Sequence, residues 1–257
     1  MTEAARAADP LFSVAGRVAC VTGASSGLGR AAASMLAARG ARVVGVARRE
    51  DALAAWRAET AGETAAVVAD LGACDDFAAL AARVSAPFGP PAIVVHAAGV
   101  NTREPADAVT PQGWRSTMAL NLDAPFFLSQ ALVPAMRAAG WGRIVNFASL
   151  QSRRAFPGGI AYGASKGGVE QLTRAMAEAW SKDGITANAL APGFFPTELT
   201  APVFTDPDRA ARNAAQTCIG RNGDLADLEG PLVFLCSDAS GYVTGQVLFV
   251  DGGFTAK

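Results

Sequence analysis

Short apolar runs alternate with longer alanine-rich stretches along nearly the whole chain. The runs are rich in Val, Ile and Ala, and several are continuously apolar, as expected of strands that are covered on both faces. A chain with this alternation is constrained to βαβ units, in which a helix connects two parallel strands. The predicted strands span residues 17–22, 41–47, 64–69, 92–97, 142–148, 185–191 and 246–250.

The stretches between the runs have helical periodicity, and the predicted helices span residues 27–38, 74–84, 123–139, 161–182 and 225–235. We therefore expect an α/β protein: a single doubly wound Rossmann domain, with a parallel sheet of about seven strands and helices on both faces. The domain should cover residues 13–257, after a flexible N-terminal extension at 1–12. Residues 192–222 follow a strand end, are rich in proline, and are predicted to form a substrate lid.

Charge and cysteine content argue against several classes of function. The net charge is −1 and no long basic run is present, so the electrostatic footprint of a nucleic-acid-binding protein is missing. No apolar stretch is long enough to span a membrane. The four cysteines form no C-x-x-C pair, and with a single histidine they indicate no metal site. Cys20 and Cys236 lie in apolar runs and are interpreted as core residues, and a reducing cytoplasm is the expected location.

A glycine-rich turn follows the first predicted strand. It reads Gly23-Ala24-Ser25-Ser26-Gly27-Leu28-Gly29 and leads into the first predicted helix. Glycine permits a tight turn and a close approach of the backbone to a ligand, and a helix N-terminus offers free N–H groups to a phosphate. In this strand–turn–helix context the pattern predicts a cradle for the pyrophosphate of a dinucleotide, although an ordinary strand–helix turn would look similar.

The end of the second predicted strand bears on the choice of dinucleotide. An acidic residue near this position would bind the ribose 2′-hydroxyl of NAD, and Ala47 cannot accept that hydrogen bond. Arg48 could instead pair with the 2′-phosphate of NADP, so NADP(H) is the preferred cofactor and NAD(H) the second choice. The alternative is that Arg48 and Arg49 are simply solvated. Asp70 ends the third strand, where it could bind the adenine amino group or cap the next helix.

Tyr162 and Lys166 carry the predicted chemistry. Their spacing places both on one helix face, one turn apart, and a neighbouring ammonium should lower the pKa of the phenol. Tyr162 could then exchange a proton with a substrate oxygen that is also held by Ser149, at the end of the preceding strand. Asn121 lies in a helical pattern, where it could bind water and link Lys166 to solvent. Taken singly, each of these residues also has an ordinary structural interpretation.

The order of these residues along the chain is recognisable. From Arg17 to Phe254 the sequence resembles the short-chain dehydrogenase/reductase family. The shared motifs are 22–29, Asp70-Leu71, Ala97-Ala98-Gly99, Asn121, Ser149, Tyr162-x-x-x-Lys166, Asn188, Pro192-Gly193 and Val250-Asp251-Gly252-Gly253. The one departure is His96, which precedes Ala97 where the family usually has an asparagine. We interpret it as a structural residue rather than a general base.

The resemblance implies an NAD(P)-dependent oxidoreductase that acts on an alcohol or carbonyl group of a small molecule and assembles as a homotetramer or homodimer. It implies a catalytic tetrad of Asn121, Ser149, Tyr162 and Lys166. Tyr162 and Lys166 also belong to the implied cofactor-binding set, which further comprises Gly23, Ser25, Ser26, Gly27, Leu28, Gly29, Arg48, Asp70, Leu71, Ala97, Ala98, Gly99, Pro192, Gly193, Phe195 and Thr197.

Residues 101–105, 149–152 and 191–200 are similar to gluconate 5-dehydrogenases and related sugar-acid oxidoreductases. A sugar acid needs a cation for its carboxylate and polar partners for its hydroxyls, and the candidates are Arg103, Gln151, Arg153 and Arg154. An alternative is a reductase of apolar ketones or 3-oxoacyl thioesters, whose substrates would suit Phe156, Phe194, Phe195, Val203 and Phe204. An alternative of another class is a non-catalytic NADP-binding regulator on the same fold.

Overall fold

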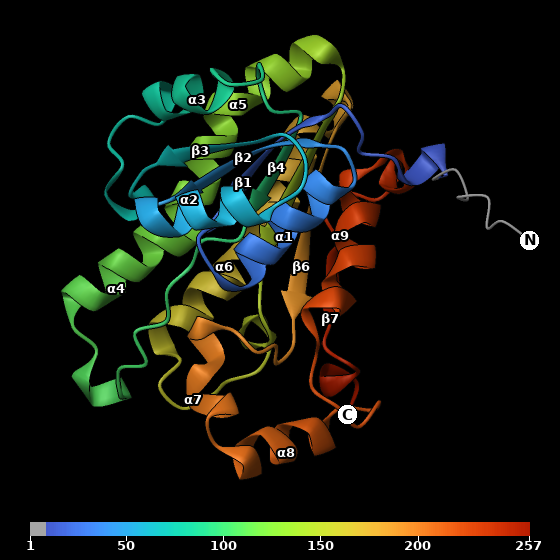
Figure 1. The fold of residues 1–257 in the computed structure, drawn as a ribbon. Coiled ribbons are helices and arrows are strands. Elements are labelled where there is room, and N and C mark those ends of the chain that lie inside the picture. Colours follow the sequence, from blue (N-terminus) through green and yellow to red (C-terminus); the bar gives the residue numbers. More distant parts are fainter. Residues whose placement is uncertain (1–8) are drawn as a thin grey trace, which may run out of the picture.

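The computed structural model describes residues 9–257, which form a seven-stranded sheet with all strands parallel (Figure 1). The strand order is β3-β2-β1-β4-β5-β6-β7, so the chain proceeds from β1 to one edge and then from β4 to the other. This is the predicted doubly wound arrangement. The strands are β1 (Val18–Thr22), β2 (Arg42–Ala47), β3 (Thr64–Val68), β4 (Ile93–His96), β5 (Gly142–Phe147), β6 (Ile185–Pro192) and β7 (Val247–Val250).

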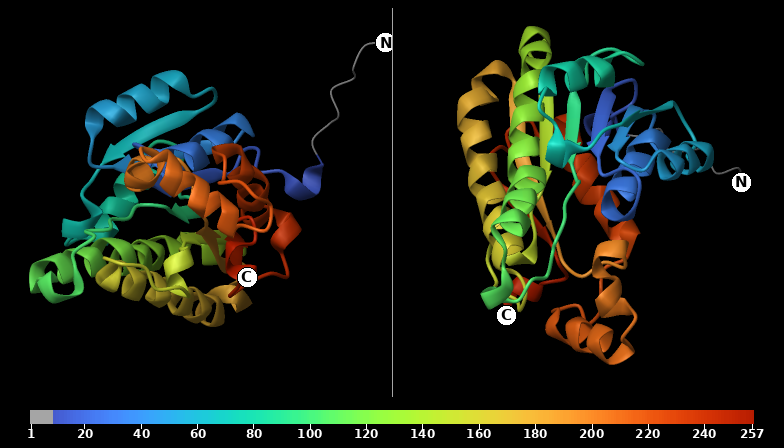
Figure 2. Two further views of the ribbon diagram at one scale, coloured as in Figure 1. Left: turned by 90° about the horizontal axis from the view of Figure 1, so that it is seen from below. Right: turned by 90° about the vertical axis from the view of Figure 1, so that its left-hand side faces the viewer.

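Helices cover both faces of the sheet (Figure 2). Helices α1, α2 and α9 lie on one face, and α3, α4, α5 and α6 lie on the other. The short helices α7 and α8 project beyond the sheet. The helices are α1 (Gly27–Ala38), α2 (Glu50–Glu59), α3 (Phe77–Ser85), α4 (Pro111–Met118), α5 (Ala124–Ala139), α6 (Ile160–Trp180), α7 (Ala201–Phe204), α8 (Pro207–Gln216) and α9 (Glu229–Cys236).

Each face of the sheet has its own apolar core. Neighbouring strand residues alternate between the two cores: Val43 packs on the α1 side and Val44 on the α5 side. This two-sided burial explains why the strand sequences are continuously apolar. Cys20 and Cys236 are buried, as predicted, and burial raises the pKa of both thiols to about 12.

Two helices that the sequence analysis does not predict, α2 and α4, bury few side chains. Helix α2 buries Leu53 and Trp56, and α4 buries only Thr117, so neither presents a long apolar stripe. The start of α4 is instead marked by its cap: Thr110 accepts a hydrogen bond from the Gly113 N–H at 2.9 Å, with proline at the first helical position. Local capping therefore marks a helix here that periodicity does not.

Two predicted helices have different boundaries in the structure. The helix expected at 74–84 begins only at Phe77, because the Asp76 side chain accepts a hydrogen bond from the Ala79 N–H at 2.8 Å and caps it there. The helix expected at 225–235 is divided into a 3-10 turn, Leu225–Leu228, and α9. Asp224 caps that turn.

The predicted lid, residues 192–222, leaves the end of β6 and contains a 3-10 turn at Glu198–Thr200 followed by α7 and α8. Helix α8 buries none of its residues. Figure 2 shows this segment standing apart from the layers that enclose the sheet. The lid therefore has regular structure but little core of its own.

Most of the predicted N-terminal extension lies outside the described residues, and Pro10–Phe12 form a 3-10 turn. None of the helices within residues 9–257 combines the length and the apolar character needed to cross a membrane. The same part of the chain holds no group of three or more His, Cys, Asp or Glu side chains placed to bind a metal ion.

Candidate active site

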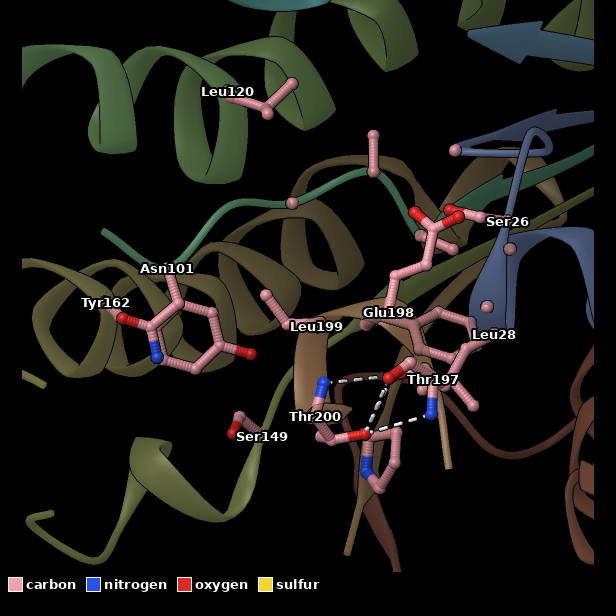
Figure 3. A pocket seen from close by; sticks show the side chains of 18 of the residues that line it. Ser26, Leu28, Asn101, Leu120, Ser149, Tyr162, Thr197, Glu198, Leu199 and Thr200 are labelled. Atoms are coloured by element: carbon pink, nitrogen blue, oxygen red, sulfur yellow. Dashed lines mark hydrogen bonds between the residues drawn. The ribbon is translucent and has the colours of Figure 1, made fainter. Parts of the chain in front are cut away.

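The carboxyl ends of the parallel strands share one edge of the sheet, and a cavity of about 520 Å³ lies along that edge. Six strand ends contribute to it: the glycine turn after β1, Arg48 after β2, Asp70 after β3, Ala97-Ala98-Gly99 after β4, Ser149 after β5 and Pro192-Gly193 at the end of β6. In a doubly wound fold this is where ligands bind. Figure 3 looks into the cavity, with Tyr162 and Ser149 toward one end and Ser26 and Leu28 toward the other.

All residues of the predicted cofactor-binding set line this cavity. Two of these glycines lie against neighbouring groups. A Cβ on Gly29 would collide with the Gly23 carbonyl oxygen, and a Cβ on Gly99 would stand 3.3 Å from Asn121 Oδ1 and 3.7 Å from Lys166 Nζ. Gly29 thus lets the turn pack tightly against the start of α1, and Gly99 leaves space beside Asn121 and Lys166.

A buried threonine hydroxyl joins the glycine turn to the neighbouring loop. Thr22 Oγ1 accepts hydrogen bonds from the Ala97 N–H at 3.1 Å and the Ala98 N–H at 3.2 Å. The residue is buried at the end of β1, between β2 and β4. Both walls of the cradle are therefore held in register by the sheet itself.

Arg48 and Asp70 line the cavity at the ends of β2 and β3. Arg48 Nη1 lies 3.7 Å from Asp70 Oδ2, and the Arg48 side chain is 69% exposed. Asp70 Oδ1 also accepts a hydrogen bond from the Gly72 N–H at 3.0 Å, which caps a 3-10 turn. The Asp70 carboxylate therefore caps a local turn and also lines the cavity, and its contact with the adenine amino group stays a prediction.

Ser149, Tyr162 and Lys166 all line this cavity. Ser149 follows the buried strand β5 and accepts a hydrogen bond from the Gln151 N–H at 3.1 Å. Tyr162 and Lys166 lie one turn apart on α6, as predicted, with Lys166 Nζ 5.7 Å from the centre of the Tyr162 ring. Lys166 Nζ donates to the Phe147 carbonyl at 2.6 Å. The three functional groups therefore converge from a strand end and one helix.

The pKa of Tyr162 differs from the sequence expectation. Burial raises it, while a hydrogen bond to Ser149 and the positive charge of Arg103 oppose that rise. Burial also lowers the pKa of Lys166 to about 8. The expected lowering of the phenol pKa by the ammonium is therefore wrong for this state of the site, because desolvation outweighs the nearby charge. The phenol is held in its protonated form, which suits a proton donor.

Asn121 lies outside the cavity wall, in a π-helical turn, Ala119–Asp123, between α4 and α5. Its Nδ2 donates to the Val100 carbonyl at 2.9 Å and to Ser165 Oγ at 3.0 Å, and its Oδ1 accepts from the Val100 N–H at 2.9 Å. Such turns often occur at functional sites. Asn121 thus fixes the loop after β4 to α6, next to Lys166; its predicted water link stays a prediction.

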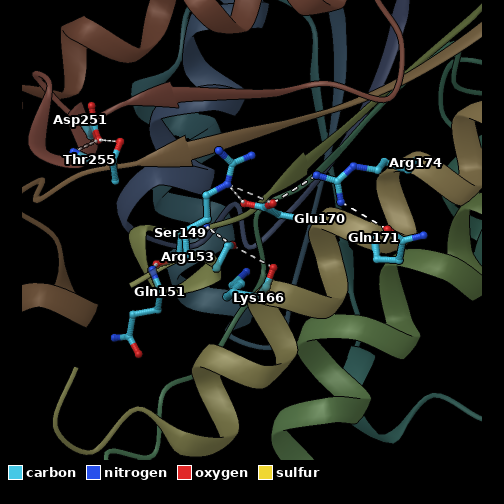
Figure 4. Close-up of polar contacts among 10 residues, drawn as sticks. Ser149, Gln151, Arg153, Lys166, Glu170, Gln171, Arg174, Asp251 and Thr255 are labelled. Carbon is cyan, nitrogen blue, oxygen red and sulfur yellow. Dashed lines mark hydrogen bonds and ion pairs between the residues drawn. The ribbon is translucent and has the colours of Figure 1, made fainter. Parts of the chain in front are cut away.

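The structure separates the four substrate candidates. Arg103 and Gln151 line the cavity, whereas Arg153 and Arg154 do not. Figure 4 shows Arg153 directed toward Glu170, where the Nε–Oε1 distance is 3.4 Å. Arg154 lies over the Phe254 ring, 5.6 Å from its centre. Adjacent side chains on a turning loop point in different directions, so the expectation that Arg153 or Arg154 meets substrate is not supported.

Comparison with known proteins agrees with this geometry. A family model described as enoyl-(acyl carrier protein) reductase matches residues 23–255. Gluconate 5-dehydrogenase of Gluconobacter oxydans (strain 621H) is 40% identical over 253 residues, which cover 96% of this chain and 98% of that protein. The chain belongs to the short-chain dehydrogenase/reductase family.

Solved structures of other short-chain dehydrogenases/reductases have the same fold. A gluconate 5-dehydrogenase from Burkholderia cenocepacia J2315, in complex with NADP and tartrate, has a TM-score of 0.89 at 38% identity and covers 96% of this chain and 98% of its own. A 3-oxoacyl (acyl-carrier-protein) reductase from Agrobacterium tumefaciens C58, with NADP bound, has a TM-score of 0.90 at 29% identity and covers 98% and 100%. Proteins that share this fold are thus named for different substrates, so fold similarity alone does not identify the substrate.

The cavity also has lining residues that were not predicted from the sequence. Arg49 and Glu198 line it at the dinucleotide end, and their pairing joins segments far apart in the chain. Phe156, Phe194 and Val203 line it as the apolar-ketone alternative expects, but Phe204 does not. The Arg48–Arg49 doublet was the available signal for Arg49, and nothing in the sequence pattern distinguished Glu198.

His96 does not line the cavity of this short-chain dehydrogenase/reductase. It is buried at the end of β4, with Nε2 2.8 Å from Ser129 Oγ. Burial lowers its pKa to about 3, so the imidazole is neutral at physiological pH. These observations agree with the structural interpretation.

Proposed function

We propose that this chain is an NADP(H)-dependent oxidoreductase that interconverts a secondary alcohol and a ketone on a sugar acid of the gluconate/5-ketogluconate type. The observation that carries the proposal is the position of Arg103, which lines the same cavity as Ser149 and Tyr162 and whose charge opposes the rise that burial causes in the pKa of Tyr162. A guanidinium there can bind a substrate carboxylate while the reacting carbon stays beside the phenol.

Arg103 is held in an unusual conformation. Its φ is +53°, the one positive φ recorded for a non-glycine residue within 9–257, and such a backbone costs about 1 kcal/mol or more. Asn101 Oδ1 accepts a hydrogen bond from the Arg103 N–H at 3.1 Å, and the guanidinium donates to the Leu199 carbonyl in the lid. Strain of this kind concentrates at ligand-binding positions, which supports a binding role for the side chain.

Gln151 offers a second polar contact. It lines the cavity, and its Oε1 is buried with no hydrogen-bond partner within the described residues. A buried carbonyl oxygen without a donor is costly, and the side-chain amide can turn to bring either polar atom toward a ligand. We infer that Gln151 binds a hydroxyl of the polyol chain.

The mechanism follows from the protonation of the site. Bound NADPH supplies the hydride. Ser149 and Tyr162 hold the substrate oxygen by hydrogen bonds, and Tyr162 gives its proton to that oxygen as the carbonyl is reduced. Burial keeps the phenol protonated for this step, and in the oxidation direction the same oxygen takes the proton back. Lys166, fixed by the Phe147 carbonyl, places a cation beside the phenolate that forms.

Phe156, Phe194 and Val203 in the cavity wall favour the alternative, a reductase of apolar ketones or 3-oxoacyl thioesters. A sugar acid also presents C–H surface to such a wall, so the aromatic residues do not exclude it, whereas an apolar ketone offers no anion to the Arg103 guanidinium, which has a carbonyl partner but no carboxylate partner within residues 9–257. A non-catalytic regulator needs no convergence of Ser149, Tyr162 and Lys166.

The test is NADPH oxidation with a panel of 5-ketogluconate, an acetoacetyl ester and a simple aryl ketone, each with and without enzyme. We expect the highest kcat/KM for 5-ketogluconate. A higher value for the ester or the aryl ketone would establish the alternative instead. Tight NADPH binding with no turnover of any compound would favour the regulator.

We also infer a homotetramer or homodimer in the cytoplasm. Strand β7 is an edge of the sheet with Leu248 39% exposed, and Phe127 on α5 is 44% exposed, so both surfaces offer apolar area to a second copy. The four free cysteines are compatible with a reducing compartment. Sedimentation at micromolar concentration tests the assembly, and a monomer alone would contradict it.

A further inference from the structure

The lid crosses directly over the glycine turn. A Cβ on Gly27 would stand 3.2 Å from Thr197 Cβ, so the first residues of the lid and the dinucleotide cradle are in contact. The next residue, Glu198, reaches Arg49 with both carboxylate oxygens: Nη1–Oε1 is 3.3 Å and Nη2–Oε2 is 3.0 Å. Arg49 Nη2 also lies 3.3 Å from Ser25 Oγ in the turn. The Glu198 carboxylate of the lid is therefore paired with the Arg49 guanidinium at the wall of the cradle.

Arg49 lies at the strand end where a protein of this fold distinguishes NADP from NAD by binding the 2′-phosphate. It follows β2, and in a doubly wound dinucleotide fold the residues at this strand end meet the ribose 2′-position. The neighbouring Arg48 faces Asp70 instead. Of the two adjacent cations, Arg49 is thus the one bound by the lid and by the glycine turn together.

A carboxylate and a phosphate compete well for one guanidinium, because both accept two parallel hydrogen bonds from it. The hydrogen bond from Arg49 holds the pKa of Glu198 below its usual range, so the carboxylate is charged at neutral pH. In Figure 3 the Glu198 carboxylate lies beside Ser26, within the wall of the cavity. Glu198 therefore presents an anion at a place suited to a ligand anion.

We propose that Glu198 is a specificity-determining residue for the cofactor: it competes with the 2′-phosphate of NADP(H) for Arg49, and binding of that phosphate releases the lid from the glycine turn. NAD(H), which lacks the phosphate, leaves the Arg49–Glu198 pair in place. The proposal rests on the proposed use of NADP(H), and it does not depend on the substrate.

The expected effect is small but measurable. The Arg49 and Glu198 side chains are 48% and 64% exposed, and exposed ion pairs contribute little because solvent screens them. Replacing Glu198 by the isosteric, uncharged glutamine should lower the Kd for NADPH by about two- to fivefold and leave the Kd for NADH unchanged within about 1.5-fold. Added salt should shrink the NADPH gain.

The experiment is a titration of NADPH and NADH, followed by their fluorescence in the absence of substrate, on the unchanged protein, Glu198→Gln and the control Glu178→Gln. Glu178 is an exposed glutamate of α6 that does not line the cavity. The same titrations on Arg49→Gln and on the Arg49→Gln/Glu198→Gln double variant complete the cycle. If Glu198 acts through Arg49, its substitution has no effect once Arg49 is gone.

Three results would overturn the proposal while leaving the sugar-acid assignment intact: no tightening of NADPH in Glu198→Gln, equal tightening of NADPH and NADH, or a gain that persists without Arg49. Failure of the unchanged protein to bind NADPH would overturn both this proposal and the proposed cofactor. A matching gain in Glu178→Gln would assign the effect to net charge and so also overturn it.

Discussion

The dinucleotide end of the cavity and the substrate end are built from different parts of the chain. At the dinucleotide end, glycines and alanines of the loops after β1 and β4 line much of the wall, and every residue of the adjoining strand β1 is buried. At the substrate end, side chains such as Arg103 and Phe194 line it, and the lid contains α8, which buries nothing. A backbone-built site depends on a few glycines and a strand order, whereas a side-chain-built site depends on where each loop turns. We therefore expect the first to vary less between relatives than the second.

The strongest test of this contrast is Tyr162→Phe, because Tyr162 lies where the two ends meet. The substitution keeps the ring and removes the transferable proton, so turnover should fall by at least about 100-fold. NADPH affinity, measured by fluorescence titration, should stay within about twofold because backbone groups hold the cofactor. Near-native turnover on the best substrate would contradict the mechanism.

Arg103→Met tests whether the substrate end reads charge. Loss of a charge-assisted hydrogen bond should raise KM for an acidic substrate by about tenfold to 100-fold, and should change KM for a neutral polyol ketone much less. The neutral compound controls for the lost contact with the lid. Arg153→Met and Arg154→Met are matched controls, because neither arginine lines the cavity. If the two compounds lose activity equally, Arg103 supports the loop and does not bind a carboxylate.

His96 at the end of β4 tests whether the buried sheet beside the dinucleotide end makes the stability of the protein depend on pH. The pKa of its imidazole is about 3 in the folded protein and near 6.5 in the unfolded chain. Between these values the unfolded chain binds the proton and the folded protein does not, so stability falls as pH drops through this window. At pH 5 the loss should be about 2 kcal/mol, which His96→Asn should remove. Denaturant unfolding at pH 7 and pH 5 measures it. Parallel losses in both proteins would contradict the assignment.

Arg48→Gln should have the smallest effect of the four, because the side chain is 69% exposed. We expect NADPH affinity to weaken by about fivefold and NADH affinity to change by less than about twofold. This result would show that a side chain also recognises the ligand at the dinucleotide end, so the two ends would differ less than their linings indicate. An unchanged protein that binds NADH more tightly than NADPH would contradict the cofactor preference.

The fold was largely predictable because its signal is repeated. The central strands are buried, several strands carry a continuous apolar run, and a parallel sheet follows from the alternation of strands with helices. Helices α2 and α4 were not predicted because so few of their residues are buried. Helix α4 begins at the Thr110 cap, whereas α2 has no side-chain cap and depends on contacts made in the folded chain.

The site was predictable to the extent that strand ends determine it. Ser149, Tyr162 and Lys166 come together because β5 leads into α6 through residues 148–159, and both elements are evident in the sequence. The direction of Arg153 and the pairing of Glu198 with Arg49 depend on loop geometry and on contacts between distant segments. The pKa of Tyr162 was predicted in the wrong direction because the depth of its burial cannot be judged from spacing.

The exposure of α8 has an evolutionary consequence. Because the helix buries none of its residues, substitutions on it should change the free energy of unfolding little, usually by less than about 0.5 kcal/mol. Such positions can accumulate mutations without bringing the protein below the stability it needs to remain folded. No residue of α8 lines the cavity, so this outer part of the segment can change while the buried sheet preserves the cavity and its chemistry. Substitutions on α8 therefore need no compensating, stabilising substitution elsewhere in the molecule.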